Sequence, residues 1–145
     1  VWYLLVCLQG PLQSLPVVQR VTHLNNWVVA HAHMGVLGFA GTIGLGGMYF
    51  LLPRVTGRPL HSRVLADLQY WLVLLGMAGF FVVLTAAGLV QGQSWLNGET
   101  VYRTLPMLHP YMVVRVGVGV LLFGAAAVGL YNVVRSLREP EGGAG

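Results

Sequence analysis

Three long apolar stretches dominate the chain, and residues that break helices separate them. The stretches run over residues 27–52, 68–90 and 112–134. A helix needs about 20 apolar residues to cross the ~30 Å hydrocarbon layer of a bilayer. The pattern therefore predicts three transmembrane helices. Proline and glycine recur in the intervening segments 53–67 and 91–111, which are expected to be loops, and a tail follows over 135–145.

The first 26 residues do not form a complete span. The apolar start is interrupted by Gly10 and Pro11, and Pro16 follows. A secretory signal would need a basic start and a small-residue cleavage site, and the sequence has neither. We expect residues 1–15 to be the end of a preceding membrane helix, residues 16–26 to be an outer linker, and the chain to be part of a longer one.

The composition supports a membrane protein. Hydrophobic residues make up 56% of the chain and charged residues only 8%, with a mean hydropathy of +0.71. A soluble domain carries about 25% charged residues, and disordered chains are polar and charge-rich. These values exclude both classes. They indicate an all-α integral membrane fold, and because the first segment is an incomplete span we expect that fold to form part of a larger helical bundle.

The charges predict an orientation. All eight basic residues are arginines, and the formal net charge is +4. They are scattered singly, without the basic stripe that a nucleic-acid site needs. Cytoplasmic segments are enriched in basic residues, which places the 53–67 loop and the C-terminus in the cytoplasm. The arginines on that side are Arg54, Arg58, Arg63, Arg135 and Arg138; those on the other side are Arg20 and Arg103, with Arg115 inside the third span.

Three other side chains have no assigned chemistry. The single cysteine, Cys7, rules out an internal disulfide and a cysteine-based metal site. It lies in an apolar run and is expected to be a small buried side chain. His61 and His109 lie in or near the predicted loops, so interfacial positions are expected for both.

The most informative pair is His31 and His33, within the first span. Ionisable residues at this depth are costly and indicate function. Side chains two positions apart on a helix are separated by about 200° around its axis. The imidazoles therefore project from opposite faces and cannot share one metal ion. They suit two separate acceptors, such as flat iron porphyrins, for which histidine is a common ligand. Interhelical hydrogen bonding and a metal-free proton relay are the alternatives.

The surroundings of the pair allow bulky groups to approach. Small residues follow it at many positions, although the same residues also serve ordinary helix packing in membranes. His23 lies eight residues before His31, at the outer mouth of the helix. It could form a polar collar for haem propionates or water with Arg20, Asn25, Asn26 and Trp27, or be a plain interfacial histidine.

Residues 22–33 resemble the tenth transmembrane helix of haem-copper oxidase catalytic subunits. In that helix a histidine at the mouth is followed eight residues later by a His-x-His pair. Residues 9–15, 52–54, 70–71, 87–92, 110–115 and 131–133 are similar to the corresponding parts of the C-type (cbb-type) enzymes. Asn26 stands where cbb-type enzymes often carry an acid.

The resemblance implies roles for the three histidines. His31 would be the proximal ligand of the high-spin haem, where oxygen is reduced, and is the candidate catalytic residue. His33 would ligate the low-spin haem, and His23 would lie near haem propionates. The expected cofactors are two haems, of b-type, together with copper or non-haem iron held by residues outside this chain.

The resemblance also implies a function. The chain would be the C-terminal part of the catalytic subunit of a respiratory terminal oxidase, reducing O2 to water with electrons from cytochrome c. Its partners would be the remaining helices, c-type cytochrome subunits and the lipid of a prokaryotic inner membrane. Alternatives are the nitric oxide reductase large subunit, a haem-bearing membrane anchor that only transfers electrons, and a non-haem structural or transport subunit.

Overall fold

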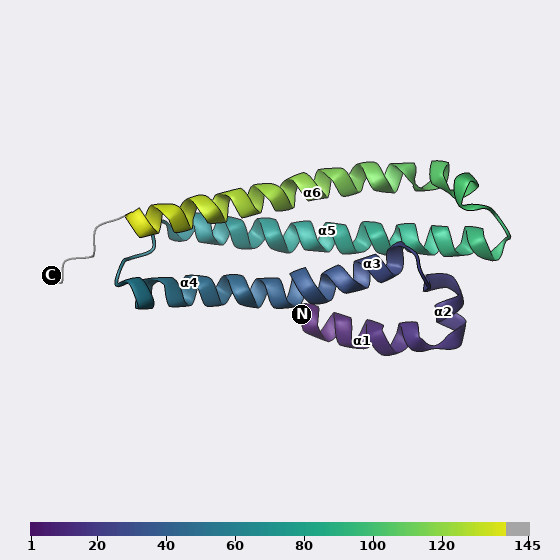
Figure 1. Ribbon diagram of the computed structural model, residues 1–145, viewed down its shortest axis with the longest axis horizontal. Helices are drawn as coiled ribbons and strands as arrows, with labels where there is room; N and C mark the ends of the chain where they lie inside the picture. The colour runs from purple at the N-terminus through teal and green to yellow at the C-terminus, as the bar shows by residue number, and fades with distance from the viewer. Residues whose placement is uncertain (139–145) are drawn as a thin grey trace.

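The computed structural model describes residues 1–138, and over that range it contains helices and no strands. Three long helical rods lie roughly parallel, and a shorter helix lies beside one of them (Figure 1). The elements in chain order are α1 (Trp2–Ser14), α2 (Pro16–Thr22), α3 (Asn26–His33), the π-helix η1 (Met34–Gly41), α4 (Thr42–Thr56), α5 (Arg63–Leu96) and α6 (Val101–Arg138).

The three rods are long and apolar enough to cross a membrane. They run over Asn26–Thr56, Arg63–Leu96 and Val101–Arg138, with 31, 34 and 38 residues. The first combines α3, η1 and α4 without a break. The all-α membrane fold expected from the apolar pattern is thereby confirmed.

Each rod extends beyond the apolar stretch that predicts it. The largest extension is in α6, which begins at Val101 and contains Pro106 and Pro110, although residues 91–111 are predicted to be a loop. Membrane helices tolerate proline where neighbouring groups re-satisfy the backbone. An apolar run predicts the part of a helix that is long enough to cross the hydrocarbon layer and misses the ends that extend beyond it.

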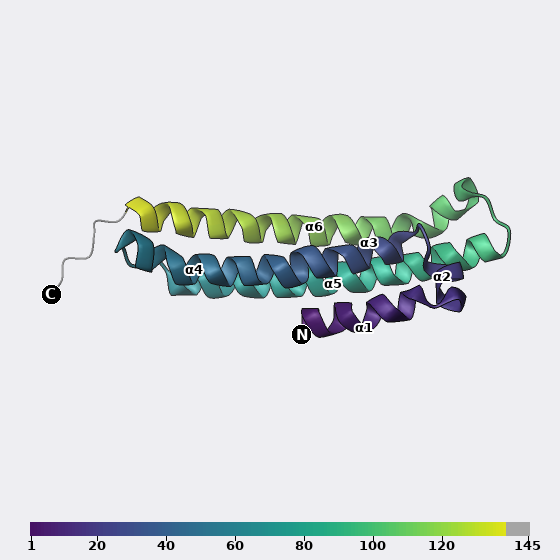
Figure 2. The same cartoon turned by 60° about the horizontal axis from the view of Figure 1, so that its bottom comes forward.

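The segment before the first rod is also more helical than a linker. Pro16 occupies the first position of α2, where its missing N–H removes no hydrogen bond. The chain then reverses at Leu24, whose φ of 57° lies in the left-handed region. As a result the first rod runs back past α1, and η1 lies alongside α1 (Figure 2). Val6 packs close to Gly35, and Trp2 packs close to Gly38.

Cys7 is exposed on α1, so the expectation that it is buried was wrong. The helix packs one face against η1 and α3. The cysteine lies on another face, which nothing in the described part of the chain covers. An apolar neighbourhood in the sequence does not specify which face of a helix is packed.

Helices α5 and α6 form an antiparallel hairpin that contributes most of the core. Val73 and Met77 of α5 pack against Ala125 of α6, and Trp2, Leu45, Leu72 and Leu122 surround them. Gly76 allows the close approach, because a Cβ there would lie 2.6 Å from the Leu122 side chain. Small residues at membrane-helix contacts commonly serve this purpose.

A polar network orders the α4–α5 connection. Asn132 is fully buried; its Oδ1 accepts the Ser62 N–H at 3.1 Å and its Nδ2 donates to the Ser62 carbonyl at 2.9 Å. The His61 N–H donates to Ser136 Oγ at 2.9 Å, and the His61 ring stands edge-on to Tyr131. His61 is thus part of the polar network that joins the α4–α5 connection to α6. The sequence predicts only an interfacial position for this histidine.

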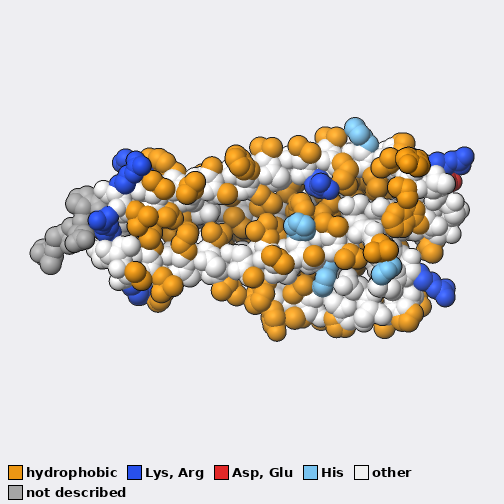
Figure 3. Space-filling view, viewed as in Figure 1, with side chains coloured by type: hydrophobic (Ala, Val, Ile, Leu, Met, Phe, Trp, Pro, Cys, Tyr) orange, Lys and Arg blue, Asp and Glu red, His pale blue; other side chains and the backbone are white. Residues whose placement is uncertain are grey.

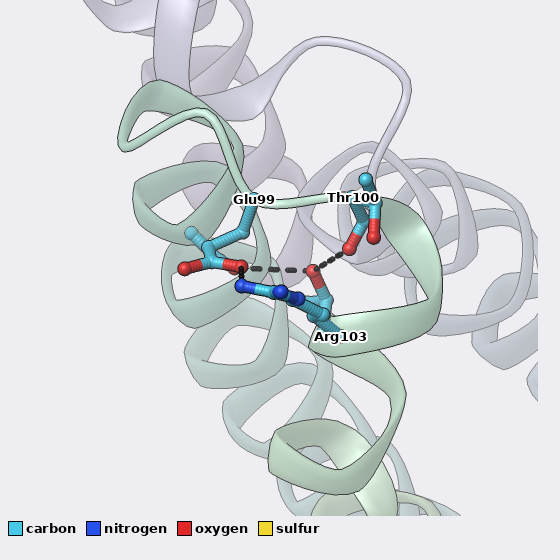
Figure 4. A network of polar contacts seen from close by, with 5 residues as sticks. Glu99, Thr100 and Arg103 are labelled. Carbon is cyan, nitrogen blue, oxygen red and sulfur yellow. Dashed lines mark hydrogen bonds and ion pairs between the residues drawn. The ribbon is translucent and has the colours of Figure 1, made fainter.

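A second network closes the opposite end, between α5 and α6 (Figure 4). Ser94 and Thr104 share a buried hydrogen bond of 3.1 Å, and Thr104 Oγ1 donates to the Thr100 carbonyl. Arg103 pairs with Glu99 at 3.5 Å. An exposed ion pair of this kind contributes about 0–1 kcal/mol, so the buried hydroxyl pair is the stronger determinant of this turn.

Candidate functional site

His31 and His33 lie on the last turn of α3, and they face different neighbours. His31 faces α1, where its Nδ1 lies 3.1 Å from Gln9 Oε1. His33 faces α5, where its ring lies 4.9 Å from the ring of Phe80. The two imidazoles are therefore directed to opposite sides of one helix.

The contact with Gln9 determines which nitrogen of His31 carries hydrogen. Gln9 is only 7% exposed, and its Oε1 can accept but not donate. Nδ1 therefore donates, and the Nε2 of the neutral ring retains its lone pair. Gly10 of α1 lies beside the ring, and a Cβ there would be in ordinary van der Waals contact with His31 Cε1, at 3.8 Å.

His33 has the same tautomer for a different reason. Its Nδ1 donates to the backbone carbonyl of Val29, one helical turn earlier, at 2.8 Å. The side chain is exposed, and none of the residues that the structure describes binds its Nε2. Metal-ligating histidines commonly donate their second nitrogen to an oxygen acceptor in this manner.

His23 has the opposite tautomer. The Gln19 side-chain amide donates to His23 Nδ1 at 2.9 Å, so the neutral ring carries its hydrogen on Nε2. The side chain is exposed and borders a depression of about 570 Å³ together with Arg20 and Trp95. His23 is thus presented as a hydrogen-bond donor rather than as a metal ligand.

The asparagines expected in the same collar have other partners. Asn25 caps α3 by accepting the Trp27 N–H and donates to the Gly88 carbonyl of α5 at 3.0 Å. Asn26 Nδ2 donates to Gln91 Oε1 at 2.8 Å. Both attach the mouth of α3 to α5, so of the polar residues predicted to form the collar only Arg20 and His23 line the depression.

Two glycines of α5 determine how close α3 and α2 can come. A Cβ on Gly88 would lie 2.2 Å from the Trp27 nitrogen, and one on Gly92 would lie 1.8 Å from the Val21 carbonyl oxygen. Neither position can hold a larger residue without moving backbone. Sequence reasoning did not assign these glycines, or Gln9, Phe80 and Gln91, to the site; the four-residue spacing of the glycines is the only local signal.

A π-helix follows the pair directly, over Met34–Gly41. Such segments are rare in proteins and frequent at functional sites. Its first nitrogen, on Met34, donates to the carbonyls of both Ala30 and His31. The wider π-helical turns therefore begin at Met34, directly after the residue that carries the second imidazole.

The donor set fits haem iron better than a bare metal ion. No cluster of three or more histidine, cysteine or acidic side chains occurs within residues 1–138. A bare ion needs several protein ligands, whereas a porphyrin supplies four nitrogens and needs the protein only at the axial positions. Helix α3 presents one imidazole with an available Nε2 on each of two sides. Each imidazole therefore meets the requirement of one porphyrin for a protein ligand.

Comparison with known proteins identifies the family. Residues 1–121 match the family model described as cytochrome c and quinol oxidase polypeptide I. A cytochrome c oxidase subunit 1 homolog of Agrobacterium tumefaciens is 31% identical over 144 residues, which cover 94% of this chain and 27% of the relative. The cbb3-type cytochrome c oxidase subunit CcoN1 of Stutzerimonas stutzeri is 29% identical over 141 residues, covering 92% and 30%.

A third relative has the same coverage pattern. Cytochrome c oxidase subunit 1 of Rhodobacter capsulatus is 31% identical over 137 residues, covering 86% of this chain and 25% of the relative. The chain thus spans between a quarter and a third of the length of these relatives. On the match over most of its length, it belongs to the cytochrome c and quinol oxidase polypeptide I family.

Proposed function

We propose that this chain forms the C-terminal part of the catalytic subunit of a respiratory terminal oxidase, and that it holds two b-type haems through His31 and His33. The assembled enzyme reduces O2 to water with electrons from cytochrome c. One observation carries the proposal: both imidazoles use Nδ1 to bind an oxygen acceptor, which leaves one Nε2 on each side of a single helix.

The haems would supply the redox chemistry, and the chain would hold the two haems at a fixed separation. His31, held by Gln9, would hold the high-spin haem, where oxygen is reduced. His33, held by the Val29 carbonyl, would hold the low-spin haem. Because both ligands belong to one continuous helix, their separation does not depend on a flexible joint.

His23 acts at the outer mouth without touching iron. Its Nε2–H and the Arg20 guanidinium border the same depression, and both are donors suited to carboxylates. They bind haem propionates or the water around them. The copper, or the non-haem iron of a nitric oxide reductase, is held by residues outside this chain.

The protein lies in the inner membrane of a prokaryote, with the Arg54–Arg63 end and the C-terminus in the cytoplasm. Its partners are the other helices of the subunit, c-type cytochrome subunits and lipid. The names of the relatives, which are cytochrome c oxidase subunits, favour oxygen over nitric oxide as substrate.

The ligand assignment is tested by replacing each imidazole in the complete enzyme. His33→Ala should remove the six-coordinate low-spin haem signal, because α3 carries no other histidine on that face. His31→Ala should abolish carbon monoxide binding at the high-spin iron. His109→Ala is the matched control, because His109 is exposed on α6 away from the pair.

Two results would contradict the assignment. One is a low-spin signal of normal amplitude in His33→Ala, and the other is a wild-type carbon monoxide difference spectrum in His31→Ala. Metal analysis of the wild-type enzyme decides the substrate class: copper supports the oxidase, and non-haem iron in its place supports nitric oxide reductase.

A further inference from the structure

A buried amide lies where α4, α5 and α6 meet. Gln69 of α5 is only 4% exposed, and its Oε1 accepts a hydrogen bond from the Tyr49 hydroxyl of α4. Gly129 of α6 makes room for the amide, because a Cβ there would overlap it. The surroundings of this side chain are therefore formed by three helices of the chain itself.

The nitrogen of this amide has no partner. An amide NH2 group has two hydrogens to donate, and no residue in the range 1–138 accepts either hydrogen of Gln69 Nε2. Burying a polar group without a hydrogen bond is unfavourable, and buried polar groups are nearly always bonded to protein or to ordered water. Gln69 therefore needs an acceptor that the described residues do not supply.

Two cavities border Gln69. One, of about 180 Å³, lies between α4 and α5 and is also lined by Tyr49. The other, of about 280 Å³, reaches α6 at Ala126, and Leu45 borders both cavities. Each cavity has room for several water molecules, since one water occupies about 30 Å³ in the liquid.

The smaller cavity offers polar partners on both of its walls. Besides Gln69, it is lined by Tyr49 and Thr42 of α4. The Tyr49 hydroxyl donates to Gln69, and the Thr42 hydroxyl donates to the Gly38 carbonyl at 2.6 Å, so each hydroxyl oxygen can still accept. A buried water needs roughly two to four polar partners, and these three side chains provide them.

The smaller cavity extends inward from the α4–α5 end of the molecule. The apolar stretch of α5 begins at residue 68, so Gln69 lies at its margin, within reach of the aqueous phase. Thr42 precedes Tyr49 by seven residues, which places it about 10 Å deeper along the first rod. It is also the first residue after η1, so the cavity reaches the base of the π-helix.

We propose that Gln69, Tyr49 and Thr42 bind water in the cavity between α4 and α5, inside the membrane. The bound molecules accept hydrogen bonds from the Gln69 amide and donate to the two hydroxyl oxygens, which satisfies the buried polar groups. The ligand is water and not a lipid chain, because an acyl chain has no acceptor for the amide. Such a site is independent of the haems that the proposed function assigns to His31 and His33.

Radiolytic hydroxyl-radical labelling of the complete enzyme in lipid nanodiscs tests this site, because radicals formed from bound water modify the side chains beside it. Tyr49 and Leu45 should be modified in the wild type, and Leu84, which is fully buried, should stay unmodified. Gln69→Leu should lower the modification of Leu45 several-fold, since an apolar side chain cannot hold the water. Gln93→Leu, at the far end of the same helix, is the matched control and should change nothing.

A second variant fills the cavity without removing a polar group. Gly46 lines the smaller cavity, and nothing lies within 4 Å of a Cβ there. Gly46→Leu should therefore assemble and lower the modification of Tyr49. Gly44→Leu is the matched control, because a Cβ at Gly44 is equally free and the residue does not line the cavity.

Unmodified Tyr49 and Leu45 in the wild type would overturn the proposal and indicate an empty or lipid-filled cavity. Equal modification of Leu45 in the wild type and in Gln69→Leu would also overturn it, since water would then be present without the amide. If Gln69→Leu does not assemble, Gly46→Leu decides: a lowered modification of Tyr49 supports the site, and an unchanged one contradicts it.

Discussion

At the residue scale, hydrogen-bond partners distinguish three histidines that the sequence presents as one motif. His31 and His33 each face an oxygen acceptor through Nδ1, and His23 faces a donor amide through the same atom. The orientation of one partner therefore decides whether an imidazole offers a lone pair or a hydrogen. Gln9 is the positioning residue for His31, because it acts on the ligand and not on the substrate.

Replacing Gln9 by leucine should weaken the attachment of His31 without removing it. The ring loses its acceptor and becomes less basic, and loss of such outer partners costs roughly 10- to 100-fold in metal affinity or activity. Resonance Raman spectroscopy of the reduced enzyme should show a shifted iron–histidine stretch. Gln13→Leu is the control on the same helix, since Gln13 Oε1 has no hydrogen-bond partner in the structure; equal spectra for both variants would exclude the role of Gln9.

At the scale of elements, the site depends on where α3 meets α5. Asn25 and Asn26 bind Gly88 and Gln91 across this contact, and the absence of a side chain at Gly88 permits it. Asn26 replaces an acid that is frequent in cbb-type enzymes, and its amide serves as a link between helices. The contact sets the position of His31 and His33 along α5.

Gly88→Ala should push α3 away from α5, because its Cβ would meet backbone rather than a flexible side chain. Overpacking typically costs about 1–3 kcal/mol, so the assembled enzyme should lose haem at a lower temperature than wild type. Gly119→Ala is the control, since nothing lies within 4 Å of a Cβ there. Equal thermal stability of the two variants, followed by haem absorbance, would contradict the close contact.

At the scale of the whole molecule, apolar side chains cover much of the face drawn in Figure 3, and most of the charged side chains on that face lie near the two ends. Many large apolar residues are exposed, including Phe50, Trp71 and Phe123. Soluble proteins rarely expose such continuous apolar surface. These surfaces therefore face lipid or further helices, which agrees with a chain that spans only part of its relatives.

The orientation predicted from the arginines is open to a direct test. A reporter that is active only in the cytoplasm, fused after Arg138 in the complete protein, should be active, because five arginines cluster at that end. The same reporter inserted at residues 97–100 should be silent. The reverse result would invert the predicted topology and place His23 on the cytoplasmic side.

Apolar run length and the 3.6-residue period are local properties, so the chain alone was enough to predict three spanning helices and the opposed directions of His31 and His33. Their partners depend on residues distant in sequence: Gln9 is 22 positions from His31, and Gly88 is 63 from Asn25. Helix α2 and the exposure of Cys7 likewise follow from which faces pack. Whether a helix face is packed or exposed depends on which other helix contacts it. A local pattern of residues does not specify that contact.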